Sequence, residues 1–251
     1  MRVARTTQRL ASTAKIILKT TLLIPTLNEI NGMKAIMPQI KREWCDQILI
    51  LDGNSIDGTA EWARQNGYEV YVQKQRGLRQ GYLEVWPLIK GDVVITFSPD
   101  GNSIAELIPP LIEKMREGYD MVIVSRYLPP AKSQDDSWLT GFGNWLFTTV
   151  INVLHGGHLT DSMVMYRAYK TGLVSTLDLD KDISHSTPER LFHTRISWEP
   201  LLSVRAIKRR LKIGEIPGDE PPRIGGKAKL QVVRWGAAYM FQVFREVFWW
   251  K

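Results

Sequence analysis

Short apolar segments alternate with helical patterns from residue 20 to residue 127, and this alternation limits the fold more than any other feature of the sequence. Segments that suit buried strands lie at 20–26, 46–52, 68–73, 92–97 and 120–127. Between the first two, apolar residues recur at helical spacing at Ile30, Met33, Ile36 and Ile40. Strands that alternate with helices form parallel sheets. We therefore expect an α/β fold with a doubly wound, mostly parallel sheet and helices on both faces.

The pattern changes after Tyr127. A Pro-rich polar loop, "LPPAKSQDDS", precedes a long apolar helix, and "EPLLSVRAIKRRLK" indicates an amphipathic helix. A short edge strand, "IGEIP", and a flexible basic loop follow. The sequence thus predicts a basic arm at 1–19, an α/β domain at 20–232 and an apolar, aromatic helix at 233–251.

Charge and cysteine content narrow the class of protein. Of the formal net charge of +7, residues 1–20 contribute +5 and residues 203–234 contribute +6, so the rest of the chain is mildly acidic. The single cysteine, Cys45, rules out an internal disulfide and suits a reducing compartment. No signal peptide or run of roughly 18 apolar residues is present. We expect a cytoplasmic protein, or one bound peripherally at the inner face of the membrane.

Polar residues follow the predicted strands at one edge of the sheet, where ligands bind in such folds. They are Asn28, Glu29, Asp52, Asn54, Asp57, Asp100 and Asn102. The residues of each loop have a structural explanation as well as a functional one. Asn28 could read a nucleobase or cap a helix, Asp52 could bind a ribose, and "SPDGN" could hold a metal or form a tight turn.

Together these motifs resemble a known family. The segments "PTLNE", "LDGNSIDGT", "QRGLRQGY" and "SPDGN", in this order, resemble the inverting glycosyltransferases of the GT-A fold, and most closely the dolichol-phosphate mannose synthases and their polyprenyl-phosphate relatives. Later segments agree: "VSRY" resembles GSRY, the stretch 141–169 resembles GN…D…SGxRA, and "EIPGDEPPRIGGKAKL" resembles VPI…RxxGxSKL. The resemblance covers roughly residues 20 to 232.

The resemblance implies a role for each matching position. The residues expected to bind the nucleoside are Pro25, Thr26, Asn28, Glu29, Asp52, Asn54, Gly77, Gln80 and Gly81. Asp100 and Asn102 are expected to hold Mg²⁺ or Mn²⁺, and Arg126 to contact the donor phosphate or sugar. Arg223 and Lys229 are expected to hold phosphate in the acceptor region, on a loop that closes over the site.

The sequence also departs from the family pattern. Ser98-Pro99-Asp100 stands where the family has Asp-x-Asp, so one carboxylate is missing. Met163-Val164-Met165 and Ala228 replace the family's Ser-Gly and serine, which leaves the acceptor open.

The implied reaction moves a sugar from a nucleoside-diphosphate sugar to an acceptor with inversion. A lipid-phosphate acceptor is already an anion, whereas a hydroxyl acceptor needs a base, for which Asp161 ranks slightly ahead of Glu199. A sugar nucleotidyltransferase and a catalytically silent nucleotide-sugar-binding protein are the alternatives.

The basic segments suggest partners. "RAIKRRLK" suits a solvated helix face, a lipid headgroup or nucleic acid, but it lacks the interleaved aromatic residues of an RNA-binding surface, so no nucleic-acid partner is expected. The aromatic tail suits a membrane surface or a homo-oligomer interface.

Overall fold

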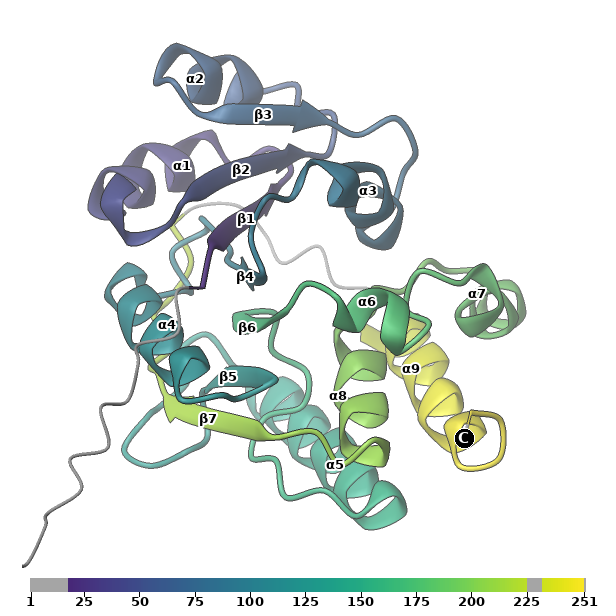
Figure 1. The fold of residues 1–251 in the computed structure, drawn as a ribbon. Helices are drawn as coiled ribbons and strands as arrows, with labels where there is room; N and C mark the ends of the chain where they lie inside the picture. Colours follow the sequence, from purple (N-terminus) through teal and green to yellow (C-terminus); the bar gives the residue numbers. More distant parts are fainter. Residues whose placement is uncertain (1–17, 225–231, 251) are drawn as a thin grey trace, which may run out of the picture.

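The computed structural model describes residues 18–224 and 232–250 (Figure 1). Its seven strands are β1 (Thr20–Thr26), β2 (Gln47–Asp52), β3 (Glu69–Val72), β4 (Val93–Thr96), β5 (Met121–Ser125), β6 (Arg167–Lys170) and β7 (Ile213–Pro217). They form one sheet in the order β3-β2-β1-β4-β6-β5-β7. Only β6 is antiparallel to its neighbours, β4 and β5. This confirms the predicted α/β class and the mostly parallel sheet.

Nine α-helices are assigned within the described ranges. They are α1 (Ile30–Ile36), α2 (Thr59–Gln65), α3 (Leu78–Val85), α4 (Ile108–Arg116), α5 (Trp138–His155), α6 (Leu173–Thr176), α7 (Ser186–Phe192), α8 (Glu199–Lys208) and α9 (Val232–Glu246). Short 3₁₀ turns lie at Met37–Gln39, Arg42–Trp44, Trp86–Leu88, Ala105–Leu107 and Asp182–Ser184.

Helices cover both faces of the sheet, as Figure 1 shows. On one face α1, α2 and α4 pack on strand side chains such as Leu22 and Ile24, and on the other α3, α5 and α8 pack on side chains such as Leu23 and Leu49. Successive residues of a strand point to opposite faces, so a strand buried on both sides must be apolar throughout. This explains the continuous apolar runs of β1 and β4.

Strand β6 was not predicted. Its four residues, Arg167–Lys170, include two basic ones and carry no alternating pattern. The strand forms because it pairs with β4 on one side and β5 on the other, and because Arg167 is fully buried, with Nη1 donating to Ser203 Oγ at 2.9 Å.

The helix predicted at 199–212 forms as α8, but its predicted amphipathic character was wrong. Every residue from Glu199 to Ile207 is buried in α8, and the helix ends at Lys208. Arg205 does not face a headgroup or a solvated surface; its Nε donates to Glu246 Oε2 of α9 at 2.9 Å. An arginine can lie inside a protein when a carboxylate pairs with it, which the local sequence pattern does not reveal.

The C-terminal helix α9 packs against α7, α8 and α5 (Figure 1). Ala238, Tyr239, Gln242 and Val243 are buried on this side. In the part of the chain that the structure describes, no helix is long and apolar enough to cross a bilayer. The predicted basic arm at 1–19 lies almost wholly outside the described residues.

Candidate active site

The carboxyl ends of β1 and β2 lie side by side, because the two strands pair in parallel with Thr26 opposite Asp52. This register brings Pro25, Thr26, Asn28 and Glu29 to the same edge as Asp52 and Asn54, as the sequence predicts. Thr26 and Asp52 are buried, and the Thr26 hydroxyl and Asp52 Oδ1 have no hydrogen-bond partner. A buried carboxylate oxygen without a donor is costly, so Asp52 Oδ1 is available to a ligand hydroxyl or amine.

Asn28 connects the loops that follow β1 and β2. It adopts a left-handed backbone conformation (φ 52°), its N–H donates to Ser55 Oγ at 2.8 Å, and its Oδ1 accepts from Ile56 N at 2.8 Å. The N-cap residue of α1 is Glu29. Asn28 is therefore neither the helix cap nor a free amide: its oxygen is used to hold the loop that carries Asp52 and Asn54.

Asp57 and Asn54 hold the same loop from its other end. Asp57 accepts from Ile30 N at 3.1 Å and from Thr59 N at 3.0 Å, and Asn54 Nδ2 donates to Gln73 O at 2.6 Å. Burial acts to raise the pKa of Asp57, but the hydrogen bonds from Thr59 and Ile30 outweigh it and lower the pKa. The loop between β2 and α2 is thus fixed before any ligand arrives.

The three residues predicted after β3 lie at the start of α3. Gly77 is its N-cap residue, and Gln80 and Gly81 follow in its first turns. Gln73, whose backbone O accepts from Asn54 Nδ2, is the first residue of the loop between β3 and α3.

Asp100 lies in the turn after β4 and is 6% exposed. Its Oδ1 accepts from Asn102 N at 3.2 Å, and its Oδ2 lies 3.0 Å from Arg223 Nη1. Asn102 Nδ2 donates to Asp135 Oδ2 at 3.0 Å, while Asn102 Oδ1 is buried without a partner. The turn also touches α1, since a Cβ on Gly32 would lie 2.3 Å from Pro99 O. Asp100 and Asn102 therefore come together, as predicted.

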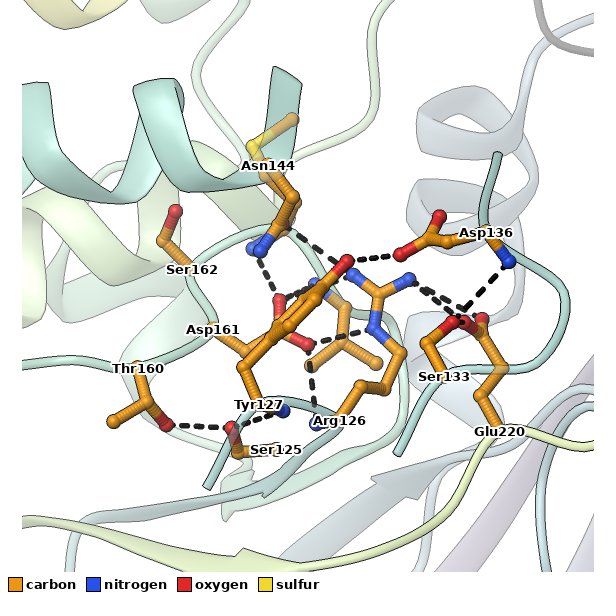
Figure 2. Close-up of polar contacts among 12 residues, drawn as sticks. Ser125, Arg126, Tyr127, Ser133, Asp136, Asn144, Thr160, Asp161, Ser162 and Glu220 are labelled. Carbon is orange, nitrogen blue, oxygen red and sulfur yellow. Dashed lines mark hydrogen bonds and ion pairs between the residues drawn. The ribbon is translucent and has the colours of Figure 1, made fainter. Parts of the chain in front are cut away.

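Arg126 forms the centre of an ion-pair network (Figure 2). Its Nε donates to Asp161 Oδ2 at 2.6 Å, its Nη2 to Asp161 Oδ1 at 3.1 Å, and its Nη1 to Glu220 Oε1 at 3.2 Å. Burial acts to lower the pKa of Arg126, but the charges of Asp161 and Glu220 outweigh it and raise the pKa. Burial raises the pKa of Glu220 above its usual value in spite of Arg126. All three nitrogens of Arg126 already donate to protein acceptors, so the guanidinium is better placed to organise the site than to grip a phosphate.

Asp161 is fully buried and accepts from the backbone N–H groups of Met163 and Val164 besides Arg126. Glu199 is 3% exposed, and its Oε1 accepts from the Tyr82 hydroxyl at 3.0 Å. Glu199 lines the more apolar of the two cavities described below, whereas Asp161 lines neither of the two. Because a proton acceptor must reach the substrate, these contacts favour Glu199, whereas the sequence ranks Asp161 first; which of the two acts as a base stays a prediction.

Two adjoining cavities meet at Arg126. One, of about 340 Å³, is lined by Ser98, Asp100, Asn102, Arg126, Glu220 and Arg223 among others. The other, of about 350 Å³, has a more apolar wall that includes Leu139, Phe147, Trp235 and Tyr239, and it contains Glu199. Arg126, Glu220 and Arg223 line both. Lys229, predicted to bind phosphate beside Arg223, lies outside the described residues.

Some residues of this site were missed by sequence reasoning. Glu220 lines both cavities, Asp135 lines the more apolar one, and Asn144 Oδ1 lies 3.4 Å from Arg126 Nη2. The only sequence signal was the Asp135-Asp136 pair in a polar loop, and such pairs are usually solvated.

The fold matches solved glycosyltransferases. A glucosyl-3-phosphoglycerate synthase from Mycobacterium tuberculosis, solved with Mn²⁺, uridine diphosphate and phosphoglyceric acid, superposes with a TM-score of 0.69 at 16% identity, over 92% of this chain and 78% of that one. A mannosyl-3-phosphoglycerate synthase from Rubrobacter xylanophilus gives 0.65 at 17% identity, over 92% and 74%. At these identities the likeness establishes the GT-A fold.

Sequence relatives cover most of the chain. An undecaprenyl-phosphate mannosyltransferase from Micrococcus luteus is 27% identical over 89% of this chain and 96% of its own length. A polyprenol monophosphomannose synthase from Mycolicibacterium smegmatis is 28% identical over 79% and 76%. Residues 21–177 match the family model described as glycosyl transferase family 2. The chain is therefore a glycosyltransferase that belongs to glycosyl transferase family 2.

Proposed function

We propose that this enzyme transfers a sugar from a nucleoside-diphosphate sugar to a polyprenyl phosphate at a membrane surface, with inversion and with help from a divalent cation. The observation that carries the proposal is the meeting of two cavities at Arg126. The more polar one has Asp100 and Arg223 in its wall, and the more apolar one is lined by α5 and α9. A diphosphate suits the first and a prenyl phosphate the second. Relatives named for undecaprenyl phosphate and polyprenol support this acceptor.

The donor would lie along the carboxyl edge of the sheet. Asp52 Oδ1, buried and without a partner, suits a hydrogen-bond donor on the nucleoside, and the ordered loop of Asn28 and Asn54 would hold Asp52 in position. Arg223 is the cation best placed for the diphosphate, because its side chain is 29% exposed and borders both cavities.

The residues around Asp100 fit Mg²⁺ or Mn²⁺. Both ions prefer hard oxygen ligands, usually one or two carboxylates together with substrate phosphates. Asp100 supplies a buried carboxylate and Asn102 an oxygen without a partner. No group of three or more acidic, histidine or cysteine ligands is found among the described residues, so the diphosphate would complete the coordination. A bound cation supplies Lewis-acid stabilisation of the leaving diphosphate.

The remaining chemistry falls to the protein. Asp161 and Glu220 hold the Arg126 side chain in place at the boundary between the two cavities, where donor and acceptor would meet. An acceptor phosphate is already an anion and can attack without a base, from the side opposite the leaving group. If a hydroxyl took its place, Glu199 in the apolar cavity would be the candidate base.

The acceptor lipid would arrive along α5. The side chains exposed on the first half of this helix are Trp138, Leu139, Phe142, Trp145 and Leu146. Leu139, Gly143 and Phe147 of the same helix line the apolar cavity. Exposed aromatic and aliphatic side chains in such number mark a contact surface, and tryptophan favours the membrane interface. The α5 helix would therefore contact the bilayer with one set of side chains and line the apolar cavity with another.

Thermal unfolding tests donor binding. The midpoint temperature should rise when the correct member of a set of UDP-, GDP-, CDP- and dTDP-sugars is added with Mn²⁺, because a ligand that binds only the folded state stabilises it by mass action. Asp52→Asn should reduce the shift. No shift with any of these sugars would contradict the proposed donor class.

A further inference from the structure

Arg223 takes the position of a counter-ion between two carboxylates. Its Nη1 lies 3.0 Å from Asp100 Oδ2 and its Nε lies 3.1 Å from Asp135 Oδ2. Asp100, Asp135 and Arg223 come from three separate segments: the turn after β4, the loop before α5 and the loop after β7. The same oxygen of Asp135 also accepts from Asn102 Nδ2. Asp135 is thus joined to both residues proposed to bind the cation, directly to Asn102 and through Arg223 to Asp100.

The loop after β7 is seated on the Asp100 turn by its backbone too. Ile224 N donates to Asp100 O at 2.8 Å. Gly101, which has φ 96°, leaves room for Ile224, since a Cβ there would lie 2.7 Å from Ile224 Cγ1. A side chain at position 101 would therefore be strained in its backbone and would push the loop away. The contact between this loop and the site is specific in shape as well as in charge.

The loop that carries Asp135 is tied to the same segment. Glu220 N donates to Lys132 O at 3.0 Å, Gln134 N donates to Glu220 O at 2.8 Å, and Ser133 Oγ donates to the Glu220 carboxylate. Because these bonds fix the chain on either side of Ser133, the nearby Asp135 is held in the wall of the more apolar cavity, next to Arg223, which also lines the cavity of Asp100. The Asp135 side chain is 28% exposed, so a bound ion or phosphate can reach it.

We propose that Asp135 provides the second carboxylate of the cation site, in place of the one missing at Ser98, and that Arg223 neutralises the two carboxylates until a divalent cation displaces it. The inference rests on the proposed function, which places the cation at Asp100. One guanidinium carries a single positive charge, whereas Mn²⁺ or Mg²⁺ carries two and binds carboxylate oxygens directly. Once released, Arg223 is free to pair with the donor diphosphate that enters with the cation.

The test is direct titration of the whole protein with Mn²⁺ alone, with the free ion followed by electron paramagnetic resonance. Asp135→Asn should weaken binding about tenfold or more, as loss of a metal-site partner commonly does. Asp135→Glu, which keeps the charge, should restore most of the affinity. Arg223→Gln should tighten binding about tenfold, because the competing cation is gone. Glu61→Gln, at an exposed position on α2, is the matched control and should leave affinity unchanged.

The outcomes distinguish the role of Asp135 from the proposed cation site at Asp100. If Asp100→Asn weakens Mn²⁺ binding but Asp135→Asn does not, the role of Asp135 is wrong and the site at Asp100 stands. If Arg223→Gln binds Mn²⁺ no more tightly than the wild type, Arg223 is not a competitor. If Asp100→Asn has no effect either, the cation site itself is misplaced and the inference falls with it. Thermal unfolding of each variant would show that the fold is retained.

Discussion

Arg126 and Asp161 form a two-pronged ion pair, with Nε–Oδ2 at 2.6 Å and Nη2–Oδ1 at 3.1 Å. The pair joins the end of β5 to the segment that leads into β6. Paired arginine and carboxylate planes of this kind fix geometry as well as charge. In a site where two cavities meet, this fixed guanidinium orders the surrounding side chains.

The main effect of Asp161→Asn should therefore be a lower free energy of unfolding. The change removes the closer of the two carboxylates that pair with the buried Arg126 and leaves only Glu220, so we expect a loss of about 3 kcal/mol in the free energy of unfolding. Urea denaturation would measure it. Glu61→Gln, which touches only an exposed pair 4.0 Å long, should cost well under 1 kcal/mol. Unchanged stability with abolished turnover would instead support Asp161 as a base.

The C-terminal helix should be required for stability. Arg205 Nε–Glu246 Oε2 is 2.9 Å, and both side chains are essentially inaccessible to solvent. We expect Glu246→Gln to lower the free energy of unfolding by about 3–5 kcal/mol in urea denaturation, because Arg205 would keep its charge without its partner. Phe248→Ser, at a residue 85% exposed in the same tail, is the control and should have little effect. Equal effects of the two changes would refute this account.

The fold could be predicted from sequence where local pattern decides it. The apolar runs of β1, β2 and β4 are buried on both faces of the sheet, and strands buried in this way are recognised by successive apolar residues. Strand β6 and the burial of α8 could not be predicted, because they depend on partners distant in the chain: β6 on two strands, and Arg205 on Glu246.

The site was predictable to the same degree. Asp52 and Asp100 follow buried strands, and the sheet then brings them to one edge. Asp135 meets Arg223 across 88 residues, and no local spacing encodes a contact between two loops. The same reason applies to Asp161 and Glu199: which of the two carboxylates pairs with an arginine depends on three-dimensional packing, which local sequence does not encode.

Stability should fall in mild acid because of His185. Burial, together with the charge of Arg79 and of the nearby Arg205 and Arg245, lowers the pKa of His185 from 6.5 to about 3. Its Nε2 lies 3.0 Å from Leu179 O. Below about pH 6.5 His185 becomes protonated in the unfolded chain but stays neutral in the folded protein. The free energy of unfolding therefore decreases as the pH falls toward 3. At pH 5 the loss of unfolding free energy caused by His185 is about 2 kcal/mol.

Urea denaturation at pH 7.5 and pH 5 would measure the effect. His185→Gln should reduce the difference in unfolding free energy between the two pH values by about 2 kcal/mol. His158→Gln, at an exposed position, should not reduce it. A pH dependence identical in all three proteins would show that His185 is not the cause.

The exposed face of α5 should bind membranes. Replacement of Trp138, Phe142 and Trp145 by serine removes side chains that are 83%, 51% and 59% exposed, so the fold should be little affected. We expect binding to phospholipid vesicles, measured by sedimentation, to fall about tenfold or more. Leu88→Ser, outside this helix, is the control. Unchanged vesicle binding by the triple variant would place the membrane contact elsewhere.

The most direct test of the proposed reaction is transfer itself. Purified enzyme would be incubated with the donor identified by thermal unfolding, Mn²⁺ and undecaprenyl phosphate, and the lipid product detected by mass spectrometry. We predict a sugar-phosphate lipid and a free nucleoside diphosphate in equal amounts, both lost on Asp100→Ala while the protein stays folded. Product formed at the wild-type rate by Asp100→Ala, or nucleoside diphosphate released without any glycosylated lipid, would contradict it.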